Sequence, residues 1–498
     1  MVASEPEQAG DPNPSIADQV TNLAGVIAVH ARLRPAQLAL VEPGRRAVTW
    51  GELEDQVAAA ASGLVAAGLV AGQRIGVDGA NSIPWVVGYL SALRAGLVVV
   101  PTDPQHSLRQ RDSLLADCGA RAVLSTREGN SPIPALPLTD DGLASLTAPD
   151  RVQVVSPPDA EALAVLALTL GTTSEPKIVM LSHRALLAHL RQVGAYGIVD
   201  SDTVVLGILP FFHAYGLNAV LGTCLAAGAR LVIPDARGND LLEVIEAERV
   251  DNLPISPGLL YRLAHDGAAL GRLATVRTVV VGGAPVPWRL GLRFTEHTQI
   301  RVERAYGLTE ASPGVTSTVG GEILGPLHVG RPLPGVEIRI GDGSDPSEPT
   351  EIWVRGANLF SGYWPAGDGA PDADGWFATG DIGYLVDGEL FLVDRTRELV
   401  SVSGFTVYPS EVEQSIRQLS EVAAVAVVGR SATAGGGMVA FVAGPDVAEA
   451  AVIDHIQAQL PAFKRPSEVR VVDDLPRGVT GVVKRAELRR QLERQERG

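Results

Sequence analysis

The sequence predicts an α/β fold, with a large N-terminal domain of helix-covered sheets, a strand-rich subdomain, a hinge, and a small α+β C-terminal domain. The chain has 498 residues, which normally means two or more domains. Short β-branched runs alternate with helical patterns, as in mostly parallel, helix-covered sheets. After about residue 340 the sequence becomes strand-rich with closely spaced glycines.

Residues 1–15 are polar, with Pro, Glu and Asp, and lack the basic and apolar segments of a secretory signal, so we expect a disordered tail. Residues 16–393 are expected to form the N-terminal domain. Thr49 and Glu52 have the spacing of a capping box before a helix. The expected strands include residues 74–77, 163–170, 204–208 and 279–281.

The last part of the chain is divided by two polar segments. Residues 341–346 form a turn cluster, and residues 394–398 separate two apolar strands. The interpretation is that residues 394–498 form a smaller, mobile C-terminal domain.

Net charge indicates which partners are disfavoured, and cysteine content indicates the redox compartment. The formal net charge is −16 and no basic run offsets it, which disfavours nucleic acid and anionic membranes. Cys118 and Cys224 lie in apolar stretches without metal-ligand spacing, which indicates a reducing, cytoplasmic location. Residues 203–229 lack acidic residues, lysine and arginine, but Pro210, His213, Asn218 and several glycines favour elements buried in protein over a membrane span.

Lysine is rare, since the chain holds only Lys177, Lys464 and Lys484 although lysine and arginine total 41. A lysine ammonium binds a phosphate oxygen as a point charge. Lys177 ends the run Thr-Leu-Gly-Thr-Thr-Ser-Glu-Pro-Lys at residues 169–177, which lies after a buried strand and before a helix starting near Ser182. Glycine lets backbone N–H groups approach a phosphate, although such a loop is also compatible with a purely structural turn.

The run Gly-Thr-Thr-x-x-Pro-Lys resembles the phosphate loop of the adenylate-forming superfamily, which includes acyl-CoA synthetases, luciferases and peptide-synthetase adenylation domains. Further similar segments follow in the family's order and extend the resemblance over roughly residues 20–495, closest to the aryl and acyl acid ligases. These segments are 93–96, 100–104, 210–213, 282–285, 305–310, 329–332, 376–381 and 394–395.

The resemblance implies an enzyme that uses ATP and Mg²⁺ to convert a carboxylic acid to an acyl adenylate, with release of pyrophosphate. It implies that Lys177, Lys484, His213, Thr309 and Glu310 are catalytic, and that Glu310 also holds the metal. The nucleotide-binding residues that it implies are Thr172, Thr173, Ser174, Gly283, Ala284, Pro285, Ala305, Tyr306, Gly307, Asp381 and Arg395. The hinge would be Asp394.

Two departures from the family pattern concern charge and loop flexibility. Leu170, Ser174 and Ile178 replace residues that keep the phosphate loop polar and glycine-rich. Val482 occupies the position of the family's C-terminal catalytic lysine, and Lys484 follows two residues later. In an extended segment Lys484 would leave the same face, displaced by about 6.6 Å. Lys484 is therefore either the working catalytic lysine or a surface lysine on a weakened enzyme.

The acid is expected to lack an α-amine, because His213 follows Phe212 where amino-acid-activating relatives usually have an aspartate. The implied pocket residues are Phe212, Tyr215, Asn218, Leu308, Pro313 and Gly314. A buried His213 satisfied by the backbone remains an alternative.

The acceptor stays open between CoA, a carrier-protein pantetheine and an amine. Ser401 and Ser403 replace lysines of CoA-dependent relatives, whereas Gly404 is retained and would border a pantetheine channel. The favoured reading is transfer to CoA or a pantetheine thiol, and the alternatives are an amide bond synthetase and a pseudoenzyme that only binds ligands.

Overall fold

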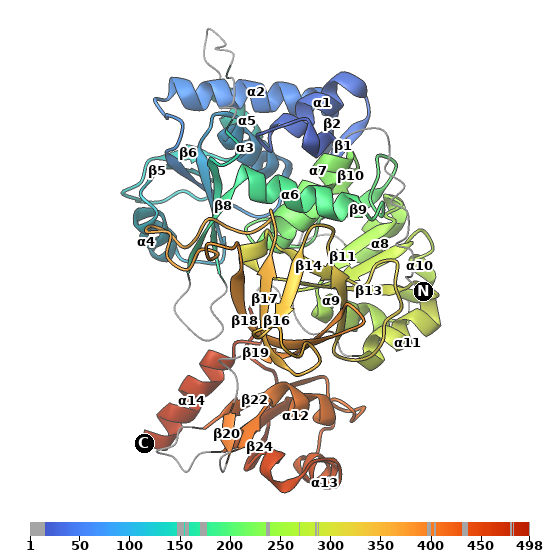
Figure 1. Cartoon of the computed structure of the whole chain (residues 1–498). Helices are drawn as coiled ribbons and strands as arrows, with labels where there is room; N and C mark the ends of the chain where they lie inside the picture. Colours follow the sequence, from blue (N-terminus) through green and yellow to red (C-terminus); the bar gives the residue numbers. More distant parts are fainter. Residues whose placement is uncertain are drawn as a thin grey trace, which may run out of the picture.

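The structure is a computed structural model. It describes residues 15–146, 154, 159–169, 177–235, 240–267, 269–283, 286, 288–395, 400–402, 405–430, 437–478, 481 and 483–497. The predicted N-terminal tail, up to residue 14, lies outside the described residues. The predicted α/β architecture is confirmed, with sheets and helices of the N-terminal part at one end and a small α+β domain at the other (Figure 1).

A mostly parallel sheet of six strands, as far as the described residues show, forms the first part of the N-terminal domain in the order β6-β5-β3-β4-β7-β8. Its strands are β3 (Arg74–Asp78), β4 (Val98–Thr102), β5 (Ala120–Ser125), β6 (Ala135–Pro137), β7 (Leu163–Leu168) and β8 (Ile178–Ser182). Only β7 and β8 pair antiparallel here. The sequence predicts a helix directly after residues 169–177, but the strand β8 comes before that helix and pairs antiparallel with β7.

A second, thirteen-stranded sheet in the described residues joins the rest of this domain to the strand-rich part, in the order β16-β17-β18-β19-β15-β14-β13-β12-β11-β9-β10-β1-β2. Its strands are β1 (Leu38–Glu42), β2 (Arg46–Thr49), β9 (Val204–Leu206), β10 (Arg230–Val232), β11 (Asn252–Ile255), β12 (Thr278–Val281), β13 (Val302–Gly307), β14 (Gly314–Ser317), β15 (His328–Pro332), β16 (Glu337–Ile340), β17 (Thr350–Arg355), β18 (Phe377–Val386) and β19 (Glu389–Arg395). The strand-rich region therefore begins before residue 340.

Helices fill the space between the two sheets and cover their outer faces. The inner group is α1 (Gly25–Leu33), α2 (Trp50–Ala66), α3 (Ile83–Arg94), α6 (His183–Gly194), the π-helix η2 (Tyr215–Gly222) and α7 (Thr223–Ala227). The remaining helices of this domain are η1 (Ile16–Asp18), α4 (Leu108–Asp117), α5 (Asp140–Ser145), α8 (Leu241–Ala247), α9 (Pro257–His265), α10 (Ala269–Arg272), α11 (Trp288–Thr298) and η3 (Thr309–Ala311). The predicted capping box holds, because the Thr49 side chain accepts from the Glu52 N–H and Glu52 accepts from the Thr49 N–H.

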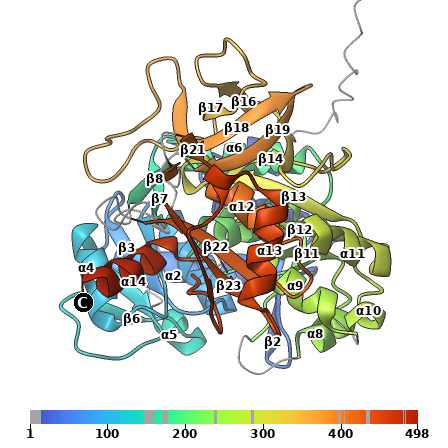
Figure 2. The same cartoon turned by 90° about the horizontal axis from the view of Figure 1, so that it is seen from below.

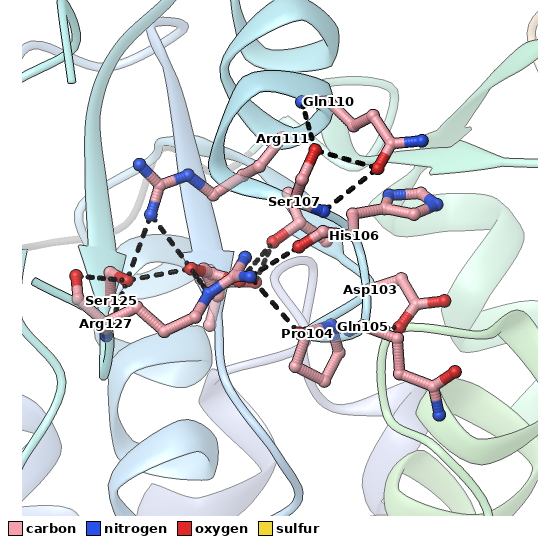
Figure 3. Close-up of polar contacts among 12 residues, drawn as sticks. Asp103, Pro104, Gln105, His106, Ser107, Gln110, Arg111, Ser125 and Arg127 are labelled. Atoms are coloured by element: carbon pink, nitrogen blue, oxygen red, sulfur yellow. Dashed lines mark hydrogen bonds and ion pairs between the residues drawn. The ribbon is translucent and has the colours of Figure 1, made fainter. Parts of the chain in front are cut away.

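A buried charge cluster, defined here as Asp78, Arg111, Ser125 and Arg127, lies at the carboxyl ends of β3 and β5. The fully buried Asp78 carboxylate accepts hydrogen bonds from Arg111 Nη1 at 3.0 Å, Arg127 Nη2 at 2.7 Å and the Ser125 hydroxyl at 2.8 Å. Figure 3 shows Arg127 also reaching the chain at His106 and Pro104, whose carbonyls accept from its Nη1. Burial alone would raise the pKa of Asp78, but the hydrogen bonds and the arginine charge lower it.

The C-terminal domain has a three-stranded sheet, β22-β23-β24, with helices on both faces (Figure 2). α12 and α13 cover one face, and α14 covers the other through Leu488 and Leu492. The elements are β20 (Val400–Val402), β21 (Phe405–Val407), α12 (Pro409–Ile416), β22 (Ala424–Gly429), β23 (Met438–Ala443), α13 (Glu449–Gln459), η6 (Ala462–Lys464), β24 (Glu468–Val471) and α14 (Arg485–Arg497).

Candidate active site

A cavity of about 790 Å³ lies against the second sheet, between its inner helices and the strand-rich part. Its polar side is lined by residues of β13, η3, β17 and β18, and its apolar side by residues of α6, η2, β9, β11 and β12. One hollow thus borders both a charged region and an apolar wall.

Lys177, Tyr363 and Glu310 form a contact chain on the polar side of this cavity. Lys177 Nζ lies 4.2 Å from the centre of the Tyr363 ring, and the Tyr363 hydroxyl donates to Glu310 Oε1 at 2.7 Å. The Lys177 N–H donates to the Thr169 hydroxyl and the Thr169 N–H to the Lys177 carbonyl, which closes the base of the loop. Thr172, Thr173 and Ser174, predicted to bind phosphate, lie outside the described residues.

Tyr306 and Asp381 meet at the same side, although they come from β13 and β18. The Tyr306 hydroxyl donates to Asp381 Oδ2 at 2.6 Å, and both residues line the cavity. Asp381 also lies opposite Arg395 where the strands β18 and β19 pair. The side chain of Arg395 lies outside the described part of the structure. Ala284 and Pro285 lie outside the described residues.

His213 and Tyr215 stand where the polar and apolar sides meet. The Tyr215 N–H donates to His213 Nδ1 at 3.3 Å, and burial lowers the pKa of His213 to about 4, so its imidazole is neutral near pH 7. The Tyr215 ring lies against Gly282 and Gly283, and its hydroxyl donates to the Val280 carbonyl. Gly283 has a φ of +79°, a conformation that favours glycine.

The other predicted site residues divide between the cavity wall and its surroundings. Those on the wall are Ala305, Gly307, Leu308, Thr309, Pro313 and Gly314. Asn218 is buried behind the wall, where its amide donates to the Leu186 and Ser312 carbonyls. Phe212 is likewise outside the lining that the described residues provide.

Lys484 does not reach the cavity, and no described residue of the C-terminal domain lines it. Lys484 is exposed and precedes α14, whose Glu487 and Leu488 N–H groups donate to its carbonyl. Its neighbour Arg485 donates to the buried Glu413 of α12 at 2.7 Å. Val482 and Gly404 lie outside the described residues, and Asp394 accepts from the Ser410 N–H at the start of α12.

The cavity residues that the sequence analysis did not single out include Tyr363, His189 and Asn252. Tyr363 lies in the run Ser-Gly-Tyr-Trp at residues 361–364, whose glycine and the following Pro365 could have indicated a turn between strands. His189 and Asn252 carry no local motif.

Two searches of the described part of the chain were negative. No group of three or more His, Cys, Asp or Glu side chains there is arranged to hold a metal ion. Among those same residues, no helix combines the length and apolarity needed to cross a membrane.

Comparison with known proteins gives matches over nearly the whole chain. Residues 27–364 match the AMP-binding enzyme family and residues 411–481 its C-terminal domain. A 3-[(3aS,4S,7aS)-7a-methyl-1,5-dioxo-octahydro-1H-inden-4-yl]propanoyl:CoA ligase of Mycobacterium tuberculosis is 33% identical, over 92% of this chain and 96% of its own. A feruloyl-CoA synthase of Amycolatopsis is 31% identical, over 93% of this chain and 97% of its own.

A solved structure shares the architecture. The O-succinylbenzoate Coenzyme A synthetase of Bacillus subtilis, in complex with ATP and magnesium ion, has a TM-score of 0.82 and 25% identity, covering 94% of this chain and 99% of its own. Together with the match over residues 27–364, this agrees with the resemblance stated from the sequence. The chain therefore belongs to the AMP-binding enzyme family, and it is an ATP-dependent, AMP-forming carboxylate ligase.

Proposed function

We propose that this enzyme joins a carboxylic acid without an α-amine to AMP and then transfers the acyl group to the thiol of CoA. The carboxylate oxygen attacks the α-phosphorus of ATP and pyrophosphate leaves; the thiol then displaces AMP from the carbonyl carbon and loses its proton. The observation that carries this proposal is the single cavity that joins Lys177, Glu310 and Asp381 to an apolar wall.

The nucleotide would occupy the polar side. Lys177 would neutralise phosphate charge, with Thr172, Thr173 and Ser174 supplying donors from the segment between β7 and β8, because charge neutralisation and alignment are the main requirements of phosphoryl chemistry. Tyr306 would contact adenine, together with Gly283, Ala284 and Pro285. Asp381 and Arg395 would hold the ribose hydroxyls.

Magnesium fits this donor set because Mg²⁺ is usually bound by one or two carboxylates together with substrate phosphates and water. Glu310 provides one such carboxylate, oriented by the Tyr363 hydroxyl. When bound, the ion would neutralise phosphate charge, and Thr309 would support the same segment.

The relatives favour CoA as acceptor, since both curated ligases above carry CoA in their names. The acids in their names carry no α-amine, in agreement with His213 in place of an aspartate. The Gly404 segment would then border the pantetheine. Transfer of the acyl group to an amine or to a carrier-protein thiol is the alternative, and the following experiment distinguishes it from transfer to CoA.

A rotation of residues 394–498 about Asp394 would bring Lys484 to the cavity. Lys484 directly precedes α14, which is held to α12 through Arg485 and Glu413, so the ammonium would move with the whole domain. Rotation of a domain about a few residues is a common way to complete a site in steps.

The test is acid-dependent exchange of labelled pyrophosphate into ATP with pooled aryl and alkyl acids, followed by addition of CoA, a pantetheinylated carrier protein or an amine. We expect exchange with at least one pool and an acyl thioester with CoA. Exchange followed by amide formation would move the acceptor to an amine, and no exchange in ATP-binding protein would favour a pseudoenzyme.

The three lysines provide matched variants. Lys177→Ala should lower exchange by roughly 100-fold or more, the usual effect of removing one group that stabilises transition-state charge. Lys484→Ala should abolish adenylate formation. Lys464→Ala should keep exchange, because Lys464 is paired with Glu411 at 2.6 Å and lies outside the cavity lining. Equal activity of all three variants would contradict the assignment.

A further inference from the structure

The apolar side of the cavity contains aliphatic side chains from several elements. It is formed by Val193, Ile198, Val199, Val205, Val220 and Leu333. The charged residues among the described cavity lining are Lys177, Glu310, Glu351, Asp372 and Asp381, all of which belong to the polar side. The wall therefore suits an apolar acid body that carries no second ionised group.

His189 interrupts this wall as a polar side chain without a partner. It is 1% exposed, and neither of its ring nitrogens has a hydrogen-bond partner among the described residues. Its ring lies against Gly314, where an added Cβ would be 2.6 Å from His189 Cε1. A buried polar group without a hydrogen bond costs roughly 1–3 kcal/mol, so a partner in the cavity is expected.

His183, six residues earlier on the same helix, is a buried histidine whose ring nitrogens do have partners within the protein. Its Nδ1 accepts from the Leu23 N–H and its Nε2 lies 3.2 Å from the Asn22 side-chain nitrogen. His183 does not line the cavity. Helix α6 thus carries two buried histidines. The ring nitrogens of His183 have partners within the protein, whereas His189 lines the cavity without a hydrogen-bond partner among the described residues.

Asn252, at the start of β11, is a second polar group of this kind on the wall. It is 3% exposed, and its Nδ2 donor has no hydrogen-bond partner. It lies opposite Val205 and Thr278 in the sheet, on a strand whose next inward residue, Pro254, also lines the cavity. A ligand oxygen beside Asn252 would satisfy this amide.

The charge state of His189 narrows the ligand group further. Burial lowers the pKa of His189 to about 3, so at neutral pH the imidazole offers one N–H donor and one acceptor and carries no charge. A hydroxyl can use both, and a ketone can accept from the N–H. A second carboxylate would find no cation on this wall.

We propose, resting on the acid ligase function above, that the substrate carries a neutral oxygen group on its apolar body, and that His189 and Asn252 bind it. The class comprises hydroxylated or keto-substituted aryl and alicyclic acids. The M. tuberculosis and Amycolatopsis relatives, with a dioxo-octahydroindenyl propanoyl and a feruloyl group in their names, are compatible with this class. His189 and Asn252 would thus determine specificity without taking part in adenylation.

The experiment compares matched acids that differ only in one oxygen, namely phenylpropanoate against its para-hydroxy derivative and cyclohexylpropanoate against its para-oxo derivative. Dissociation constants are measured by calorimetry, and pyrophosphate exchange is measured separately. We expect the wild type to bind the oxygenated member of at least one pair about tenfold more tightly, the factor that corresponds to about 1.4 kcal/mol.

His189→Leu should remove this preference while the affinity for the oxygen-free acid stays within about threefold, since that acid has no oxygen group to bond to His189. His189→Gln, which keeps a donor and an acceptor, should retain part of the preference. Asn252→Leu serves as a second variant on a different element. Val193→Ile, one turn along α6 on the same wall, should change both members of a pair alike.

Equal binding within both pairs, no binding of any of the four acids, or an unchanged preference in both the His189 and Asn252 variants would overturn the proposal. Pyrophosphate exchange without a preference for the oxygenated acid would support the ligase function and contradict the role of His189. A preference for the oxygenated acid without pyrophosphate exchange would support the role of His189 in binding and contradict the ligase function.

Discussion

Asp78 and His189 are both buried polar side chains of the N-terminal domain, but their surroundings differ completely. The Asp78 carboxylate accepts from two arginines and a serine at the carboxyl ends of β3 and β5. The His189 imidazole has no hydrogen-bond partner and faces the cavity. The comparison teaches that a buried polar group bonded within the protein stabilises the fold, whereas one that lines the cavity without a partner is available to a ligand.

Breaking the paired region should have the largest effect. Asp78→Asn leaves Arg127 facing an uncharged partner and leaves Arg111 with Asp112 as its carboxylate partner. Removal of one member of a buried ion pair costs roughly 3–5 kcal/mol. The free energy of unfolding, measured by urea denaturation, checks this. Glu337→Gln, in an exposed pair with Arg355, is the control and should change stability very little. Similar effects of both variants would contradict the comparison.

The two histidines of α6 sharpen the comparison. His183→Leu leaves the Leu23 N–H without its acceptor and removes the contact of the ring with the Asn22 side chain, so it should lower stability by roughly 1–3 kcal/mol. His189→Leu removes an unpartnered polar group and should leave the ligand-free protein as stable as the wild type or more stable. Thermal or urea unfolding of the two variants in parallel measures this. An equal loss in both would mean that His189 has a structural partner.

The third prediction concerns the pH dependence of stability. The pKa of His189 is lowered to about 3 in the folded protein, from an ordinary value near 6.5, so the unfolded chain binds the proton first as pH falls. Its contribution is complete above pH 6.5 and is lost toward pH 3, by up to about 1.4 kcal/mol per pH unit. His189→Leu should flatten the profile between pH 7 and pH 5. Parallel profiles would count against a buried, neutral His189.

The sequence predicted those parts of the fold and site that depend on local pattern. The capping box at Thr49 and the order of the glycine-rich and acidic motifs are readable along the chain, and the α/β architecture was confirmed. The strand β8 was missed because five residues directly before a helix carry too little periodicity to stand out.

His189 and Asn252 could not be found in this way. His183 and His189 look alike in a helical pattern, and what distinguishes them is Asn22 and Leu23, about 160 residues earlier in the chain. The assignment of Lys484 also depends on tertiary structure. The next residue, Arg485, donates a hydrogen bond to Glu413 of α12, and this contact fixes the position of the segment that carries Lys484. Roles of the other site residues remain predictions that the variants above test.

The second sheet runs without interruption from β2 to β16, and β13 within it carries Tyr306 next to strands that bear the apolar wall. A nucleotide that pulls β18 toward β13 would therefore alter the space in which the acid binds. Such coupling is thermodynamically reciprocal, because any factor by which ATP changes the affinity for the acid is the factor by which the acid changes the affinity for ATP. The acid whose binding ATP strengthens most would then also be the acid that most tightens nucleotide binding, so the ATP affinity can report how strongly each acid is coupled to the nucleotide.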